Sequence, residues 1–85
     1  MAIVHIVSSY AQSVLPISGE VLDGKNREPL IGVTVVEKGT KNGVITDIDG
    51  KFSMRVPVGT ILKITYMGYR SSEVIIRDNK PLTIL

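Results

Sequence analysis

The stretch Lys51-Phe52-Ser53-Met54-Arg55-Val56 decides the fold class, because its residues alternate strictly between polar and apolar. A period of two is the pattern of a β-strand that buries one face and exposes the other to water. We therefore expect Phe52, Met54 and Val56 to face a hydrophobic core. If Phe52 is a core residue, the substitution Phe52→Ala will cost about 3–5 kcal/mol of stability.

Similar short β-prone runs lie on both sides of this stretch, separated by Gly, Asn, Asp and Pro. No window of helical length is free of these breakers, which argues against α-helices. The expected strands are 17–22, 33–38, 44–46, 51–56, 60–66, 69–77 and 82–85. Short strands at this regular spacing predict an all-β fold, an antiparallel Greek-key β-sandwich of about seven strands.

Length and composition indicate one ordinary folded domain. The chain has 85 residues, of which 44% are hydrophobic and 21% are charged. The formal net charge is only +2 and no Lys/Arg cluster is present, so nucleic acid is not an expected partner. The absence of Cys and the single histidine, His5, exclude disulfides, thiolate nucleophiles, catalytic triads and multi-histidine metal sites.

The first residues differ in character from the rest of the chain. Ser9 and Ala11 have the spacing that a signal peptidase prefers, with cleavage before Gln12. We interpret residues 1–13 as a signal-like or flexible N-terminal segment and residues 14–85 as the domain. A leading β-strand, or residues foreign to the native protein, are the alternatives for the first segment. No stretch approaches the ~18 apolar residues of a transmembrane helix.

Two motifs suggest ligand loops, but their residues favour turns. Aligning Gly50 of Asp47-Ile48-Asp49-Gly50 with position 6 of a calcium loop places Ile45 and Val56 at positions that require oxygen ligands. The run from Gly39 to Gly43 lacks the GK[ST] ending of a phosphate loop. We interpret both as hairpin turns. Since no carboxylate pair is placed in a pocket, we expect no catalytic, cofactor-binding or metal-binding residues and no enzyme activity.

Candidate interaction residues come from two aromatic and two basic positions in the turns. Tyr66 continues the face of the preceding strand and is expected to be buried with its hydroxyl bonded, whereas Tyr69 is the more exposed and is a candidate for stacking on a sugar or a partner. Arg27 and Lys41, with Lys25 and Lys38 beside them, belong to the first two turn regions, which we expect to face the same end of the sandwich as a basic rim that could meet an acidic partner. A solvated loop surface is the alternative for this rim.

Strand edges are the other candidates for partner contact. Leu82 and Ile84 belong to the last strand, which is expected at a sheet edge, and the first strand is a second candidate edge. An exposed edge offers unpaired backbone groups to which a partner can add a strand.

Five motifs follow one another in a fixed order between residues 17 and 69. They are Gly19-x-Val21-x-Asp23, Pro29-Leu30-Ile31-Gly32-Val33-x-Val35, Gly39-Thr40-x-x-Gly43, Thr46-Asp47-x-Asp49-Gly50-x-Phe52 and Tyr66-x-Gly68-Tyr69. Their order resembles that of the carboxypeptidase-regulatory-like domain, a transthyretin-like seven-stranded sandwich. More narrowly, it resembles the copy at the mature N-terminus of TonB-dependent outer-membrane receptors of the Bacteroidetes type, which import glycans and other large nutrients.

The resemblance implies a non-catalytic accessory domain that acts by protein–protein contact and needs no cofactor. The implied partners are the plug and barrel of a receptor or a periplasmic energy-transducing component. The implied location is the periplasm or outer membrane of a Gram-negative bacterium, with membrane contact only through a following barrel that this chain does not contain. The alternatives are a carbohydrate-binding or adhesion module with weak glycan contact, and a structural spacer.

Overall fold

Seven β-strands form the described part of the protein. The computed structural model describes residues 14–85, so the expectations for residues 1–13 lie outside the described residues. The strands are β1 (Val14–Val21), β2 (Thr34–Glu37), β3 (Gly43–Ile45), β4 (Lys51–Pro57), β5 (Ile61–Thr65), β6 (Ser72–Ile75) and β7 (Leu82–Ile84). No helix within these residues is long and apolar enough to cross a membrane.

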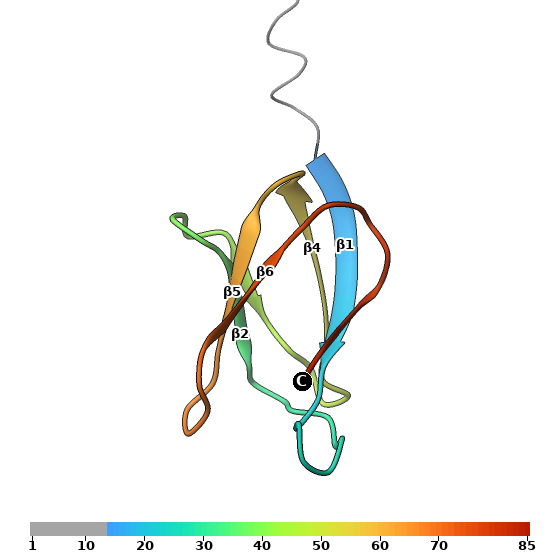
Figure 1. Cartoon of the computed structure of the whole chain (residues 1–85), viewed down its shortest axis with the longest axis vertical. Helices are drawn as coiled ribbons and strands as arrows, with labels where there is room; N and C mark the ends of the chain where they lie inside the picture. The colour runs from blue at the N-terminus through green and yellow to red at the C-terminus, as the bar shows by residue number, and fades with distance from the viewer. Residues whose placement is uncertain (1–13) are drawn as a thin grey trace, which may run out of the picture.

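The strands form two sheets that face each other (Figure 1). One sheet has three strands in the order β4-β1-β7, and the other has four in the order β3-β2-β5-β6. The prediction of an all-β sandwich with seven strands is confirmed.

The core lies between the two sheets and follows the predicted alternation. In β4, Phe52, Met54 and Val56 are buried, while the residues between them are exposed. The other buried hydrophobic residues are Ile17, Val21, Val33, Val35, Leu62, Ile64, Ile76 and Ile84. Every strand except the short β3 and β6 therefore contributes at least one buried apolar side chain, and Val44 and Val74 of those two strands pack against the cluster.

The pairing of β1 corrects two expectations. β1 pairs antiparallel with β4 but parallel with β7, so the sandwich is mixed rather than purely antiparallel. The reason is the connection 76–81, which crosses from the four-stranded sheet to the three-stranded sheet at the end where β1 begins (Figure 1). Because β1 is the middle strand of its sheet, the expectation that the first strand offers a free edge is wrong.

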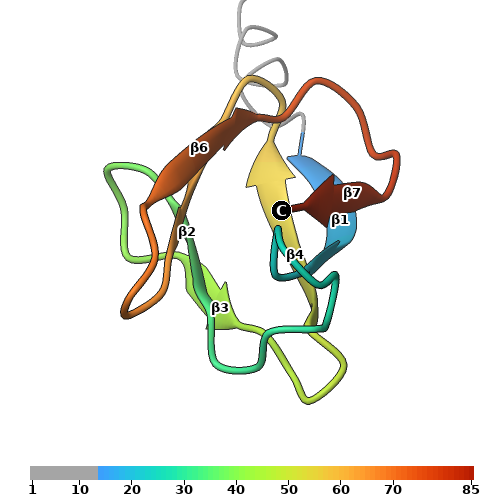
Figure 2. The same cartoon turned by 60° about the horizontal axis from the view of Figure 1, so that its bottom comes forward.

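Successive loops alternate between the two ends of the sandwich (Figures 1 and 2). The lower end, as drawn in Figure 1, carries loops 22–33, 46–50 and 66–71 together with Leu85. The upper end carries loops 38–42, 58–60 and 76–81.

This alternation separates two residues that the sequence analysis placed together. Arg27 lies at the lower end and Lys41 at the upper end, because β1 and β2 run in opposite directions. The expectation that both contribute to one basic rim is therefore wrong.

The strand boundaries differ from the prediction on either side of β5. The expected strand 69–77 is shortened to β6, Ser72–Ile75, because residues 66–69 form a turn. In that turn the backbone N–H of Tyr69 donates to the carbonyl of Tyr66 over 3.0 Å. The longest strand is β1, with eight residues, and β5 has five.

Candidate interaction surface

Large apolar side chains gather at the lower end of the sandwich. The described residues include eight exposed large hydrophobic side chains, and five of them belong to this end. They are Ile31, Ile48, Met67, Tyr69 and Leu85, which are 54%, 75%, 93%, 48% and 60% exposed. We call these five residues the lower apolar surface.

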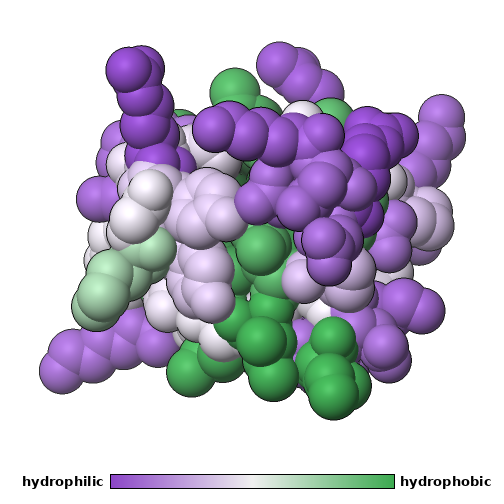
Figure 3. All heavy atoms as spheres, turned by 90° about the horizontal axis from the view of Figure 1, so that it is seen from below, coloured by the Kyte–Doolittle hydropathy of each residue, from purple (hydrophilic) through white to green (hydrophobic). Residues whose placement is uncertain are grey.

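Figure 3 views this end from below, with apolar atoms in the centre and along one side and hydrophilic atoms crowded on the other. Exposed apolar side chains that gather at one end of a domain mark interaction sites more often than single scattered hydrophobic residues do.

Thr46 fixes the loop that carries Ile31. Its buried hydroxyl accepts a hydrogen bond from the N–H of Val33 over 2.9 Å and donates one to the carbonyl of Leu30 over 2.6 Å. The N–H of Gly32 in turn donates to the carbonyl of Thr46 over 3.1 Å. These three bonds hold both sides of Ile31 against the end of β3, so its side chain has a defined place on the surface.

The carboxylate of Asp47 stabilises the turn that carries Ile48. Asp47 Oδ1 accepts hydrogen bonds from the N–H groups of Asp49 and Lys51, both over 2.9 Å. Gly50 has a φ of 72°, and a Cβ placed on it would lie 2.6 Å from the carbonyl oxygen of Val21. The turn interpretation of this motif is confirmed. Within residues 14–85, no group of three His, Cys, Asp or Glu side chains is arranged to hold a metal ion.

The third loop presents Met67 at the tip of a tight turn. Gly68 follows with a φ of 87°, a conformation that suits the third position of a type II turn. The rings of Tyr66 and Tyr69 lie 5.4 Å apart at an angle of 33°. Tyr66 is only half-buried, which corrects the expectation of full burial: it follows β5 at the mouth of the sandwich, beside Gly32.

A hydrogen bond between Tyr69 and Asp23 joins the third loop to the first. The Tyr69 hydroxyl donates to Asp23 Oδ2 over 2.7 Å, and Asp23 Oδ1 accepts from the N–H of Lys25 over 2.8 Å. The bond to Tyr69, followed by the bond to the Lys25 N–H, lowers the pKa of the Asp23 carboxyl below its ordinary value. The same bond to Asp23 raises the pKa of the Tyr69 hydroxyl. Tyr69 thus serves as a cross-link as well as a surface residue.

An open hollow of about 650 Å³ lies on this surface, with Met67 and Tyr69 among its lining residues. Two further hollows lie near it. A cavity of about 50 Å³ lies at the lower mouth of the sandwich, with Leu30, Tyr66, Tyr69 and Leu85 among its lining residues. Its volume suits a water molecule or two rather than an organic ligand.

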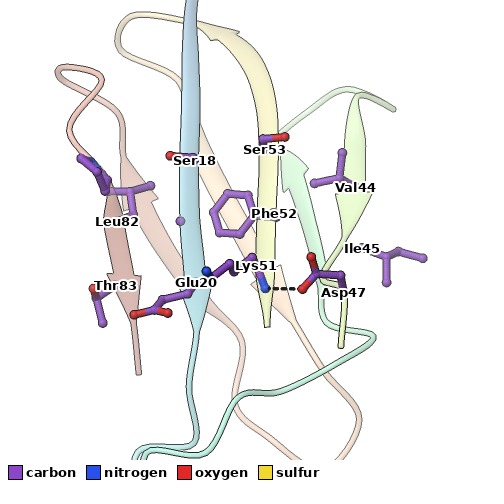
Figure 4. Close-up of a pocket in the computed structure, with 12 residues that line it drawn as sticks. Ser18, Glu20, Val44, Ile45, Asp47, Lys51, Phe52, Ser53, Leu82 and Thr83 are labelled. Atoms are coloured by element: carbon purple, nitrogen blue, oxygen red, sulfur yellow. Dashed lines mark hydrogen bonds between the residues drawn. The ribbon is translucent and has the colours of Figure 1, made fainter. Parts of the chain in front are cut away.

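The second hollow is open and has a volume of about 650 Å³ (Figure 4). Its lining includes Ser18, Glu20, Lys51, Ser53 and Thr83, which come from all three strands of the smaller sheet. These polar groups are spread along the hollow. In the described part of the chain no buried side-chain polar atom lacks a partner, so no orphaned group points to a ligand here.

The remaining predicted interaction residues are dispersed. Arg27 is exposed in the first loop with a φ of 63°, and Lys41 is exposed at the upper end. The side chain of Ile84 is buried and that of Leu82 is half-buried, so these residues offer a partner the backbone edge of β7 rather than their side chains.

The upper end differs in chemistry from the lower end. Its loops carry four cations, Lys38, Lys41, Arg77 and Lys80, and one carboxylate, Asp78. Lys38 Nζ lies 3.0 Å from a Glu73 carboxylate oxygen, and both side chains are about half exposed. Exposed ion pairs of this kind contribute little to stability. With four cations and one carboxylate in its loops, the upper end is a basic surface.

Sequence reasoning found Tyr69 but missed Ile31, Ile48 and Met67. The sequence does contain a pattern that could have identified them. Each is an apolar residue one or two positions before a turn glycine, where polar residues are usual. The sequence does not show that the three turns meet at one end, because that follows from the direction of the strands.

Comparison with known proteins identifies related sequences. Residues 17–84 match the family model of the CarboxypepD_reg-like domain. The chain is 37% identical over 83 residues to the TonB-dependent receptor P39 of Formosa agariphila, an alignment that covers 93% of this chain and 8% of that receptor. It is 38% identical over 68 residues to the TonB-dependent receptor SusC of Bacteroides thetaiotaomicron, covering 80% of this chain and 7% of that receptor. The chain thus spans less than a tenth of the length of these relatives.

Proposed function

Since this chain belongs to the CarboxypepD_reg-like domain family, we propose that residues 14–85 form an N-terminal accessory domain of a TonB-dependent outer-membrane receptor. In this proposal the domain lies on the periplasmic side of the outer membrane of a Gram-negative bacterium. It acts by contact with protein and performs no chemistry of its own. The plug and barrel of the receptor, or a periplasmic energy-transducing component, are the proposed partners.

The lower apolar surface is the observation that supports a contact function. Its five side chains are exposed to water although the domain has a buried apolar core, and three hydrogen-bonded loops hold four of the five in place. A surface that is ordered before binding loses less conformational entropy when a partner covers it. Apolar side chains on ordered loops therefore suit protein contact.

An in-frame deletion of residues 14–85 from the receptor that carries them tests the proposed function. We expect the shortened receptor to reach the outer membrane in a similar amount, because the barrel would not depend on this domain, and to import its nutrient more slowly. Uptake equal to that of the unaltered receptor at equal abundance would contradict the proposal.

The carbohydrate-binding alternative predicts a different result. Purified chain would bind to a glycan array, and Tyr69→Ala would abolish that binding. Under the proposed function, we expect no binding to the array.

A further inference from the structure

We propose that the lower apolar surface is the face on which the body of the receptor, the polypeptide that follows residue 85, packs. This inference rests on the proposed function and adds which face of the domain the partner covers. The partner is a part of the same polypeptide, and its contact surface is apolar at the centre and polar at the margin.

The chemistry of the surface defines what fits on it. Ile48 and Met67 project from the tips of turns in loops 46–50 and 66–71, and Ile31 extends from loop 22–33. Their neighbours at the margin of the same end include Lys25, Arg27, Glu28, Asp49 and Arg70, a mixture of both signs. An apolar centre with a mixed polar margin is the arrangement of a protein–protein interface.

The chain leaves the sandwich through this same surface. Figure 2 shows the C-terminal residue at the centre of the lower end, surrounded by the loops. The N–H of Leu22 donates to the carbonyl of Ile84 over 2.8 Å, and a Cβ on Gly24 would lie 3.9 Å from the backbone of Leu85. The next residues of a longer chain must therefore begin among the loops that carry the surface.

Covalent continuity favours packing at this end. A tethered partner is present at an effective concentration in the millimolar range when the linker is short and flexible. In the relatives the rest of the receptor is more than ten times longer than this chain, so it offers ample surface to cover the lower end.

The upper end supplies a matched control position. Met67 and Val58 occupy the same place in two similar turns, 66–69 and 57–60, each closed by a backbone hydrogen bond of 3.0 or 3.2 Å. Each is followed by a glycine with positive φ, 87° at Gly68 and 91° at Gly59. Both side chains are exposed, but they lie at opposite ends of the sandwich.

Photocrosslinking in the full-length receptor tests the inference. p-Benzoylphenylalanine replaces either Met67 or Val58, the receptor is irradiated in outer-membrane vesicles, and the crosslinked peptides are identified by mass spectrometry. We expect position 67 to crosslink to residues beyond 85 of the same polypeptide and position 58 to give at least about tenfold less of these products. Mixed isotope-labelled receptor separates crosslinks within one chain from those between two.

Charge substitution gives a second measurement. Met67→Glu would place a carboxylate in the packed interface and weaken the packing. The rate at which an added protease cleaves the segment just after residue 85 should then rise at least about tenfold. Val58→Glu should change this rate less than about twofold. Both variants should melt close to the wild type when tested as the isolated chain, since both positions are exposed.

The outcomes separate this inference from the proposed function. A reading frame that encodes no plug and barrel after residue 85 overturns both. A receptor in which position 67 crosslinks only to a second copy, to another protein or to lipid, or in which both positions behave alike, overturns the packing inference and leaves the receptor assignment standing.

Discussion

Phe52 and Gly19 form one tightly fitted pair in the core. The two residues lie opposite each other on β4 and β1, and a Cβ placed on Gly19 would lie 2.9 Å from the Phe52 ring. The ring therefore occupies the space that a side chain at position 19 would need. Figure 4 shows Phe52 between β1 and β4, with Val44 of β3 directed toward it.

Phe52→Ala should lower the free energy of unfolding by about 3–5 kcal/mol, because it leaves a cavity that Gly19 cannot fill. A domain of this size has a total stability of roughly 5 kcal/mol, so the variant should be largely unfolded at 37 °C. Urea denaturation followed by circular dichroism measures the change. Ser53→Ala, at the neighbouring exposed position, is the control and should stay within about 0.5 kcal/mol of the wild type. A Phe52→Ala midpoint equal to that of the control would contradict the core assignment.

Thr46 is the buried polar residue on which the first loop depends. Thr46→Val keeps the shape of the side chain but removes both hydrogen bonds of the hydroxyl, leaving the Val33 N–H without that partner. We expect a loss of about 1–3 kcal/mol in the free energy of unfolding. Thr46→Ser, which keeps the hydroxyl and loses one methyl group, is the control. If Thr46→Val proved at least as stable as Thr46→Ser, the hydroxyl would not be the anchor of the loop.

At the scale of the elements, the glycine turns differ in what surrounds them. Gly50 and Gly59 both have positive φ, so alanine at either position incurs a backbone strain of about 1–2 kcal/mol. Only at Gly50 would the new methyl group also collide with backbone, 2.6 Å from the Val21 carbonyl oxygen, whereas nothing lies within 4 Å at Gly59. Thermal melts should therefore show Gly50→Ala to be clearly less stable than Gly59→Ala. Equal melting temperatures would show that the turn moves freely away from β1.

The Tyr69–Asp23 hydrogen bond should make the link between two loops depend on pH. The pKa of Asp23 is lowered in the folded protein, so its contribution is present above its unfolded pKa and is lost as the pH falls through the folded value. The pKa of Tyr69 is raised, so its contribution is present below its unfolded pKa and is lost as the pH rises through the folded value.

The measurement is the difference in melting temperature between the wild type and Tyr69→Phe across the pH range. This difference should be largest near neutral pH and should shrink toward both extremes. In an Asp23→Asn background the effect of Tyr69→Phe should be nearly independent of pH. A difference that stays constant from acid to alkali in the wild-type background would refute the assigned bond.

The sequence predicted the elements well where side chains alternate and less well where the chain turns. The period of two in residues 51–56 gave the buried face of β4 correctly, because alternation is a local property. The shortening of β6 was missed because residues 69–71 have no polar or apolar pattern that distinguishes a turn from a strand end. The parallel pairing of β7 with β1 was missed because it depends on a crossing between sheets, which no local pattern records.

At the scale of the whole molecule, β7 closes the sandwich. It pairs with β1 and places the buried Ile84 in the core. A chain that ends at Lys80 should lose cooperative thermal unfolding, since the loss of Ile84 alone is expected to cost about 2–5 kcal/mol. Leu85→Asp, which alters an exposed residue just beyond β7, is the control and should melt close to the wild type. A cooperative melt of the shortened chain near the wild-type temperature would contradict this role of β7.

The candidate surface could be predicted only in part, because it is a property of the whole molecule. Tyr69 was identified from its place in a motif, and its exposure is confirmed by the structure. Ile31 and Ile48 lie in different loops, and only the common direction of β1 and β3 brings those loops to one end. Arg27 and Lys41 fail as a pair for the same reason.

The parallel register of the first and last strands also determines how the domain would respond to tension. β1 begins at the upper end, β7 finishes at the lower end, and the two strands lie side by side with Val21 opposite Ile84. A force that pulls the two ends of the domain apart would slide these strands past each other. The hydrogen bonds between them would then be loaded together in shear rather than opened one after another. The domain would resist stretching along this axis more strongly than its modest thermodynamic stability suggests.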